Sequence, residues 1–378
     1  MDQNFLEYAS YVIKDRAIPD IEDGLKPVQR RILHTMNEID DGKFNKVANI
    51  VGETMKLHPH GDAAIGSALV VMANKEYVID KQGNFGNLLT GDPASASRYI
   101  EARLTPLAKE TLFNTELTEY AESYDGRNKE PVVLPCKLPL SLLFGAEGIA
   151  VGMSTRILPH NINEIIDAQI AFLQNKSFKL RPDFLSGGLL DASEYEDGNG
   201  KVRVRAKIEI TDDKLLTVRE LPFGVTTESL IQSIQDAVNK GKFKLSSIDN
   251  FTAETVEIEL KAARGMDAEK LLKLLYAFTQ CEVSISVNML LIQDNQPVQL
   301  NASEVLKRNT LRLKDLLKQE LMLSLKQTKQ KWHQGRMEMF FIRERLYKKL
   351  ETCDSYEEAL EVVRKAVLNI ESILPFPI

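Results

Sequence analysis

The sequence predicts a multidomain α+β protein that ends in a long helix. Its 378 residues are too many for one ordinary hydrophobic core, which favours two or three domains. The spacing of the apolar residues also changes along the chain, from helical to alternating and back to helical. We therefore divide the chain into residues 1–145, 146–300 and 301–378.

The pattern of residues 1–145 predicts several short helices separated by turns. Apolar residues at helical spacing over 28–36 follow Pro27, and proline suits the first turn of a helix. A second helix is expected over 63–73, with Asp62 as its N-cap. A long loop is expected over 82–93, whereas residues 96–104 taken alone resemble an ordinary helix start. Short helices with a loop and a strand are typical of a winged-helix or helix-turn-helix unit, and also of other small helical domains.

The middle part, residues 146–300, has the pattern of an α+β domain. Charged and apolar residues alternate without a break over 201–210, which predicts one strand with a solvent-exposed face, and the pattern returns over 255–260. Helical stretches are expected at 228–240 and 267–278. Strands interleaved with helices, with one sheet face exposed, indicate the α+β class.

The last part, residues 301–378, predicts a long helix. Proline is absent from 302 to 374, and leucines from Leu306 to Leu325 recur every three to seven residues. We interpret this as one arm of a coiled coil; the alternative is an amphipathic helix packed on its own domain. Residues 301–350 contain 13 Lys and Arg against 5 Asp and Glu, a balance of +8 that we assign to a solvated helix face.

The composition indicates a cytoplasmic protein without a membrane partner. No stretch approaches the ~20 apolar residues that span a bilayer, and the first residues lack the pattern of a secretory signal. Three unclustered cysteines indicate a reducing compartment. The net charge of −6 argues against a histone-like DNA binder, but it does not exclude DNA binding, which depends on where positive charges cluster.

Several kinds of site are excluded by missing motifs. Neither G-x-x-x-x-G-K-[ST] nor G-x-G-x-x-G occurs, so ATP, if it is used, is expected on another chain. His58 and His60 have no third ligand nearby, which argues against zinc, and we expect no metal site. The serine hydrolase motif G-x-S-x-G is also absent.

Five motifs occur in a fixed order along the first 161 residues. They are DGLKPVQRR at 23–31, HPHGD at 58–62, QGNFG at 82–86, Arg98-Tyr99, and GIAVGMST at 148–155. The series resembles the A subunits of DNA gyrase and topoisomerase IV, the bacterial type IIA DNA topoisomerases. The resemblance is close from Tyr8 to Asn161 and looser up to the start of the long helix.

The resemblance implies a winged-helix DNA-gate domain, an α+β tower domain and a coiled-coil arm. It also implies that Tyr99 attacks double-stranded DNA and becomes linked to the 5′ phosphate, while a second copy of the chain cuts the other strand and another duplex passes. The expected assembly is an A2B2 complex of a homodimer with two B subunits, at the nucleoid in the cytoplasm. The B subunits would bind Mg²⁺ and ATP, so no cofactor is expected in this chain.

The implied chemistry explains the residue types. A phosphotyrosyl ester retains the energy of the broken bond, so resealing requires no fuel. A phenol with a pKa of ~10 is a poor nucleophile at neutral pH and requires help with its proton and with the developing charge. We expect Tyr99, Arg98, His58 and His60 to be the catalytic side chains, with Arg98 stabilising the transition state and one histidine handling the proton.

The family pattern also places four basic side chains near the same phosphates. They are Arg16, Lys26, Arg30 and Arg31. Arg30 and Arg31 are expected to position the DNA backbone. Two structural alternatives remain open: Arg16 could pair with Asp20, and His60 could cap the following helix.

Ile149 is expected to touch DNA. An apolar side chain on a glycine-flanked turn can enter a base step and kink the duplex, at a cost of a few kcal/mol that additional contacts offset. The alternative, without the resemblance, is an ordinary packed strand residue beside Val151.

The sequence departs from the family at the quinolone site. Ala63 and Ser67 stand where relatives commonly have a serine and an acidic residue, so the drug site is altered while the catalytic motif is not. The sequence ends without a returning helix, a completed dimer gate or a DNA-wrapping domain, which favours a topoisomerase IV-like activity over a fragment of the gyrase A subunit. A non-catalytic architectural DNA-binding protein of the same fold is a third hypothesis, opposed by Arg98, Tyr99 and the two histidines.

Overall fold

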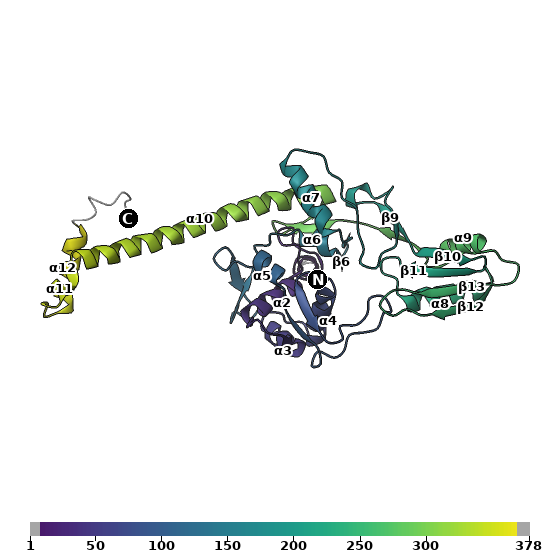
Figure 1. Ribbon diagram of the computed structural model, residues 1–378, viewed down its shortest axis with the longest axis horizontal. Coiled ribbons are helices and arrows are strands. Elements are labelled where there is room, and N and C mark those ends of the chain that lie inside the picture. The colour runs from purple at the N-terminus through teal and green to yellow at the C-terminus, as the bar shows by residue number, and fades with distance from the viewer. Residues whose placement is uncertain (1–7, 369–378) are drawn as a thin grey trace. The chain divides into compact units, whose positions relative to one another are not determined.

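The computed structural model describes residues 8–368, and it divides into two compact units, of which the first ends at Leu316 and the second begins at Leu317 (Figure 1). The predicted mixture of helices and strands followed by a long helix is confirmed. All the described strands lie in the first unit. None of the described helices is both long enough and apolar enough to cross a membrane.

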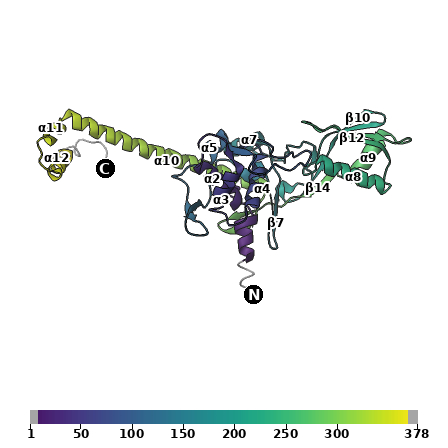
Figure 2. The same cartoon turned by 90° about the horizontal axis from the view of Figure 1, so that it is seen from below.

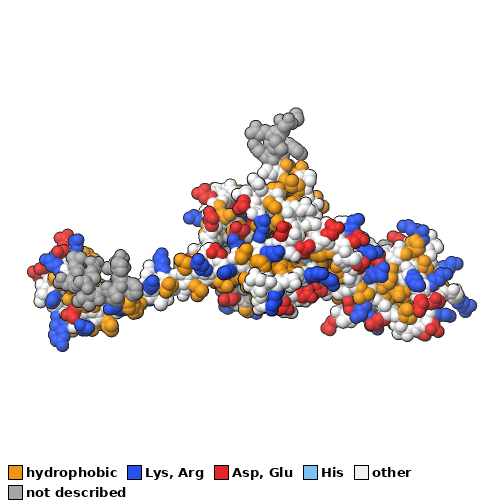
Figure 3. Space-filling view, turned by 90° about the horizontal axis from the view of Figure 1, so that it is seen from above, with side chains coloured by type: hydrophobic (Ala, Val, Ile, Leu, Met, Phe, Trp, Pro, Cys, Tyr) orange, Lys and Arg blue, Asp and Glu red, His pale blue; other side chains and the backbone are white. Residues whose placement is uncertain are grey.

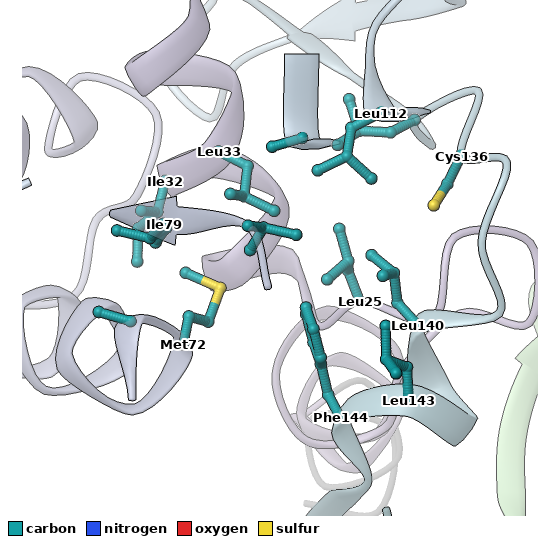
Figure 4. Close-up of a cluster of buried hydrophobic side chains, with 14 of the residues drawn as sticks. Leu25, Ile32, Leu33, Met72, Ile79, Leu112, Cys136, Leu140, Leu143 and Phe144 are labelled. Carbon is teal, nitrogen blue, oxygen red and sulfur yellow. The ribbon is translucent and has the colours of Figure 1, made fainter. Parts of the chain in front are cut away.

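Short helices around a small sheet form the first hydrophobic core. The helices are α2 (Pro27–Glu38), α3 (Val47–Thr54), α4 (Asp62–Ala73), α5 (Pro106–Leu112) and α6 (Leu140–Phe144). The antiparallel sheet has the order β1 (Asn45–Lys46), β3 (Glu101–Leu104) and β2 (Ile79–Gln82). Figure 4 shows Ile32 and Leu33 of α2 directed toward Met72 of α4 and Ile79 of β2. This burial holds α2, α4 and the sheet in a fixed arrangement.

Two hairpins and a π-helical turn complete the surroundings of the motifs. The hairpins are β4 (Tyr120–Glu122) with β5 (Lys129–Pro131), and β6 (Ala146–Ile149) with β7 (Ser154–Ile157). The π-helical turn η1 (Ile13–Ala17) ends the N-terminal helix that begins the described residues.

The predicted start of α2 is confirmed and that of α4 is one residue off. Pro27 opens α2, and the Gln29 side chain accepts a hydrogen bond from the Lys26 backbone amide at 2.9 Å, which fixes the first turn. In α4 the N-cap is Gly61; Asp62 is already helical, and its carboxylate accepts from the backbone amide of Ala63 at 2.9 Å. Helix ends commonly differ by one residue in this way.

Residues 96–104 form a turn followed by β3, so the resemblance to a helix start was misleading. Ala102 and Leu104 are buried, while Glu101 and Arg103 are partly exposed. This alternation suits the central strand of the small sheet, where β3 pairs with both β1 and β2.

The first core does not end at residue 145, where we placed the domain boundary. Its buried members include Ile165 of α7 (Ile162–Leu173), Leu291 of β15 (Leu290–Gln293) and Leu306 of α10 (Ala302–Arg343). β15 pairs with β16 (Gln296–Gln299). The chain therefore leaves this core after α7 and returns to it before α10, because the apolar faces of both segments are buried there.

A second core lies in the α+β region. A four-stranded antiparallel sheet has the order β10 (Lys207–Asp212), β11 (Leu215–Glu220), β13 (Ile258–Ala262) and β12 (Leu245–Asn250). Helices α8 (Thr227–Asn239) and α9 (Ala268–Phe278), both predicted to within one residue, lie beside this sheet (Figures 1 and 2). Leu230 and Ile234 of α8 and Leu271 of α9 are buried with the strand residues.

Another sheet of the same region has the order β14 (Glu282–Ser286), β9 (Lys201–Arg205) and β8 (Leu189–Asp191), and the short helix η2 (Glu196–Gly198) precedes β9. Positive and negative side chains are interspersed over the visible face of the α+β region (Figure 3). Arg203 pairs with Asp191, and Arg219 pairs with Glu209 and Glu257.

The prediction of one strand over 201–210 was wrong, because the chain changes sheets at Ala206. Ala206 is fully buried, its amide donates to the Cys281 carbonyl at 2.8 Å, and its carbonyl accepts from the Tyr276 hydroxyl at 3.0 Å. β9 and β10 on either side belong to different sheets. The second predicted strand, over 255–260, begins later, at Ile258.

The long helix α10 contains 42 residues and ends before Arg345, whose φ of +50° breaks the helical path. Val305 and Leu306 near its start are buried in the first core. Within the second unit, Leu321 and Met339 are largely exposed. Two shorter helices follow, α11 (Leu346–Leu350) and α12 (Tyr356–Leu368).

Candidate functional site

Tyr99 lies in a turn that the start of α3 holds in place. The backbone amides of Val47 and Ala48 donate to the carbonyls of Ile100 at 3.0 Å and Ser97 at 3.1 Å. The Tyr99 amide donates to the Ala96 carbonyl at 2.9 Å. The backbone is therefore fixed, while the Tyr99 side chain is 63% exposed. A nucleophile that must reach a large substrate requires this combination of a rigid backbone and an open side chain.

Arg98 lies against the tyrosine that follows it. Its guanidinium carbon is 4.6 Å from the centre of the Tyr99 ring, and the side chain is exposed. A cation over an aromatic face is attracted by the ring, so the two side chains hold each other near one surface. A phosphate that reaches Tyr99 would therefore meet a permanent positive charge.

The segment before this turn is attached to the α+β region. The amide of Thr227, at the start of α8, donates to the Leu89 carbonyl at 2.8 Å, and Leu89 packs against the second core. Within the segment, the Ser95 amide donates to the Asn84 carbonyl at 2.9 Å. The loop that carries Tyr99 is thus anchored by α3 on one side and by α8 on the other.

The two histidines of the HPHGD motif form a cluster with Arg31 and Tyr11. The ring centres of His58 and His60 are 4.8 Å apart, with their planes at 71°. The Tyr11 hydroxyl and His60 Nε2 are 2.6 Å apart, and Arg31 Nη1 and His58 Nδ1 are 2.8 Å apart. His60 therefore pairs with Tyr11, in contrast to the alternative in which it caps α4.

His58 is buried, and its pKa is lowered to about 4. The main cause is burial, which disfavours the charged ring, and the positive charges of Arg31, His60 and Arg16 add to it. His58 is therefore neutral at pH 7. A neutral imidazole with so low a pKa suits hydrogen-bond donation better than proton uptake.

Arg30 lies in the interior and pairs with Asp23. The two guanidinium–carboxylate hydrogen bonds are 2.6 Å and 3.0 Å long, and the Asp23 carboxylate also accepts from the amides of Leu25 and Leu134, both at 3.0 Å. Asp23 is fully buried and requires a cation to balance its charge. The structure therefore gives Arg30 a structural role, and its contact with DNA stays a prediction.

Arg16 and Lys26 lie close to the β6–β7 hairpin. Arg16 is exposed on η1 and has no ion-pair partner among residues 8–368, so the alternative pairing with Asp20 is not formed. A Cβ on Gly148 would lie 2.0 Å from the Ala17 carbonyl oxygen, which shows how closely β6 approaches η1. Lys26 Nζ donates to the Glu147 carbonyl, and burial lowers the pKa of Lys26.

Ile149 is the last residue of β6 and is 80% exposed. The following turn closes with a hydrogen bond from the Ala150 amide to the Met153 carbonyl at 2.8 Å, and Gly152 adopts a φ of +72° that favours glycine. Ile149 is thus a strand residue, as the alternative holds, but its side chain is not packed within the described chain. An apolar side chain this exposed at the end of a hairpin has the accessibility that insertion between bases requires.

Comparison with known proteins decides the family, because residues 16–371 match the family model of the A subunit of DNA gyrase/topoisomerase IV. The chain belongs to this family. It is 51% identical to the A subunit of DNA topoisomerase 4 from Borreliella burgdorferi, over 100% of this chain and 62% of that protein. The DNA gyrase A subunits of Leptospira biflexa and Lawsonia intracellularis are 38% and 37% identical, over 81% of this chain. The matches cover 40% and 41% of those two proteins, so the chain spans only part of the length of these relatives.

Ala63 and Ser67, the two expected departures from the family pattern, are exposed one helical turn apart on α4. Residues four apart lie on the same face of a helix. In the same helix, a Cβ on Gly66 would lie 3.4 Å from the Ser97 hydroxyl. Ala63 and Ser67 are therefore part of a helix that lies against the Tyr99 turn.

The four expected catalytic residues fall into two groups. His58 and His60 are in contact and His58 also contacts Arg31, whereas no hydrogen bond, ion pair or ring contact within residues 8–368 joins this cluster to Tyr99 or Arg98. No group of three or more His, Cys, Asp or Glu in the described chain is arranged to hold a metal ion.

Sequence reasoning missed the partners Tyr11 and Glu130. Tyr11 precedes the motifs, and Glu130 lies 99 positions from Arg31, with which it pairs. Neither residue belongs to a motif, so no local signal identifies it.

Proposed function

We propose that the chain is the DNA-cleaving and rejoining part of a topoisomerase IV-like type IIA topoisomerase. The observation that carries this proposal is the exposed Tyr99, fixed by α3 and accompanied by Arg98, in a chain that belongs to the family of gyrase and topoisomerase IV A subunits. The chain is 51% identical to the A subunit of a topoisomerase 4 and 38% identical to the A subunit of a gyrase. The higher identity to the former favours a topoisomerase IV-like protein over a fragment of a gyrase A subunit.

The reaction follows from the chemistry of a tyrosine nucleophile. The Tyr99 oxygen attacks the phosphorus as its proton leaves, forming an O–P bond to the 5′ phosphate. The bond to the 3′ oxygen breaks, and that oxygen takes up a proton. Arg98 would offset the charge that grows on the phosphate oxygens. Resealing reverses these steps, with attack by the 3′ hydroxyl and release of Tyr99.

The architecture supports the expected division into parts. Helices α2, α3 and α4 with the sheet β1-β3-β2 would form the winged-helix DNA gate, and the region of α8 and α9 would be the tower. The long helix α10, with its exposed leucines, would be a coiled-coil arm.

Cleavage of both strands requires two copies of Tyr99, so the active form would be a homodimer. Mg²⁺ prefers several carboxylate ligands, and no group of three or more His, Cys, Asp or Glu within residues 8–368 is arranged to hold a metal ion. Mg²⁺ and ATP would be bound by the B subunits in an A2B2 complex with double-stranded DNA, at the nucleoid in the cytoplasm. Bound Mg²⁺ would supply additional positive charge for the phosphate.

The proposal is tested with the full-length protein, its B subunit, supercoiled plasmid and Mg²⁺. Denaturation by detergent should trap protein on the 5′ ends of the DNA. Attachment to 3′ ends would overturn the mechanism. Tight DNA binding without any attached protein would indicate the non-catalytic architectural alternative.

Replacement of Ile149 by alanine should reduce DNA bending and cleavage together. The exposed side chain would no longer enter the base step, and the kink brings the scissile phosphate to Tyr99. Bending is measured by fluorescence transfer between the ends of a short duplex. Met153 on the same hairpin is 42% exposed, and Met153→Ala is the matched control. Unaltered bending in Ile149→Ala would rule out insertion.

The enzyme should respond weakly to quinolones. In relatives, a metal ion chelated by the drug contacts the protein through bridging water molecules. The Ala63 side chain cannot form a hydrogen bond to these waters, and the Ser67 side chain has no charge. Loss of one charge-assisted hydrogen bond, roughly 1.5–3 kcal/mol, corresponds to about ten- to a hundredfold weaker binding. The double variant Ala63→Ser with Ser67→Asp should restore drug-stabilised cleavage and leave drug-free activity unchanged. Wild-type sensitivity equal to that of relatives with both anchors would contradict the argument.

A further inference from the structure

We propose that Glu130 is a positioning residue that, through Arg31, fixes His58 as a neutral ring with its proton on Nε2, aimed to donate a hydrogen bond to DNA phosphate. This inference rests on the proposed DNA cleavage. It assigns a role to a residue of the β4–β5 hairpin, outside every motif of the sequence.

The tautomer of His58 follows from the identity of its partner. Arg31 Nη1 lies 2.8 Å from His58 Nδ1. A guanidinium has only donors, so Nδ1 must accept and cannot carry a proton. The neutral ring then has its proton on Nε2, for which the described residues provide no hydrogen-bond partner. His58 is left with one N–H that is available to a ligand.

Glu130 determines where the Arg31 guanidinium lies. Its carboxylate accepts from Arg31 Nε and from Nη2, the latter at 3.0 Å, which leaves Nη1 to reach His58. The Arg31 and Glu130 side chains are only 15% and 14% exposed. A two-point contact between planar groups fixes the direction of the remaining N–H groups. The carboxylate therefore orients the histidine from the far side of the arginine.

Burial and, after it, the surrounding positive charges keep His58 neutral. Arg31 of α2, His60, and Arg16 of η1 all disfavour a positive ring. Glu130 is the acidic group of the cluster, and it is paired with Arg31; Asp15 of η1 also lies near both of them. The Tyr11 hydroxyl is bonded to His60. His58 thus remains an uncharged donor over the pH range in which an ordinary histidine titrates.

The first test observes the ring directly. Long-range ¹H–¹⁵N spectra of the ¹⁵N-histidine-labelled chain would be recorded without DNA, with His58 assigned from His58→Gln. We expect an Nε2-protonated neutral ring at pH 5–8 in the wild type. In Glu130→Ala, the pKa of the ring should rise from about 4 toward its usual value of about 6.5, because Arg31 is no longer held at Nδ1, while burial continues to lower it. A proton on Nδ1 in the wild type, or an unchanged titration in Glu130→Ala, would overturn the proposal.

The second test measures cleavage by the full-length protein together with its B subunit. Glu130→Ala should lower the cleavage rate about ten- to a hundredfold at pH 8, the effect of losing a hydrogen bond to a charged group. The deficit should shrink toward pH 5.5, because a protonated His58 carries N–H groups on both nitrogens. In a His58→Gln background the same change should have little further effect. If the losses of cleavage rate from Glu130→Ala and His58→Gln are additive and do not depend on pH, the role of Glu130 is merely structural.

A matched control uses another arginine–carboxylate pair. Arg103 and Asp80 on β3 and β2 are 3.0 Å apart and do not contact His58. Asp80→Ala should alter neither the His58 titration nor the pH dependence of cleavage. If the wild type forms no phosphotyrosyl link, the proposed function fails while the spectra still decide the state of His58. If the wild type cleaves DNA but the spectra do not show the expected state of His58, only the role of Glu130 is refuted.

Discussion

Replacement of Tyr99 by phenylalanine is expected to lower DNA cleavage by about four orders of magnitude or more, the usual result of removing a covalent nucleophile. The change removes one oxygen from a side chain that is 63% exposed, so the fold is preserved. The ring that Arg98 contacts is also retained. The loss is measured as protein covalently trapped on plasmid DNA.

DNA affinity should change little in the same variant, because phosphate contacts dominate binding and none of the basic side chains is altered. Binding should still weaken as salt rises. Tyr124, a phenol in the loop between β4 and β5 that is 58% exposed, provides the matched control, and Tyr124→Phe should cleave like the wild type. Equal cleavage by Tyr99→Phe and the wild type would refute the assignment of the nucleophile.

Replacement of Asp23 by alanine is expected to destabilise the first unit by about 3–5 kcal/mol, the usual cost of removing one partner of a buried ion pair. Arg30 is 9% exposed and would keep a charge without its counterion. The amides of Leu25 and Leu134 would also lose an acceptor. The effect is measured as the decrease in the free energy of unfolding in urea.

Two further variants separate the buried charge from a general weakening of the fold. The double variant Asp23→Leu with Arg30→Met should regain much of the lost stability, because apolar side chains of similar volume can replace a buried ion pair. Asp80→Ala breaks a partly exposed pair and should cost at most about 1 kcal/mol. If Asp23→Ala lowers the free energy of unfolding no more than Asp80→Ala does, the structural role of Arg30 is contradicted.

The elements predicted correctly are those whose signals are local. Pro27 and the apolar spacing after it determine α2, and the same kind of spacing determines α8, α9 and α10. The strand over 201–210 was mispredicted because an alternating pattern says which side of a strand is buried but not which strand it pairs with. Only β9 alternates buried and exposed residues, whereas in β10 Ile208 is partly buried and the rest are exposed. The change of sheet at Ala206 depends on Cys281, 75 positions later.

The site shows the same limit. Arg30 and Arg31 are adjacent in the motif, yet successive residues of a helix point about 100° apart. Arg30 therefore faces Asp23 in the interior, while Arg31 faces His58 and Glu130. A motif shows that both arginines occur together, but not which of them is available to DNA. The residues that decide this are distant in sequence.

The double anchoring of the Tyr99 loop has a consequence for how the protein can be divided. Leu89 packs against the second core, and its carbonyl is held by the start of α8, so this loop is attached to both hydrophobic cores. A fragment trimmed to the helices around α2 and α4 would retain the tyrosine but lose half of the scaffold that holds its loop. The smallest piece that preserves the geometry of the nucleophile therefore includes the α+β region, although that region supplies none of the expected reacting groups.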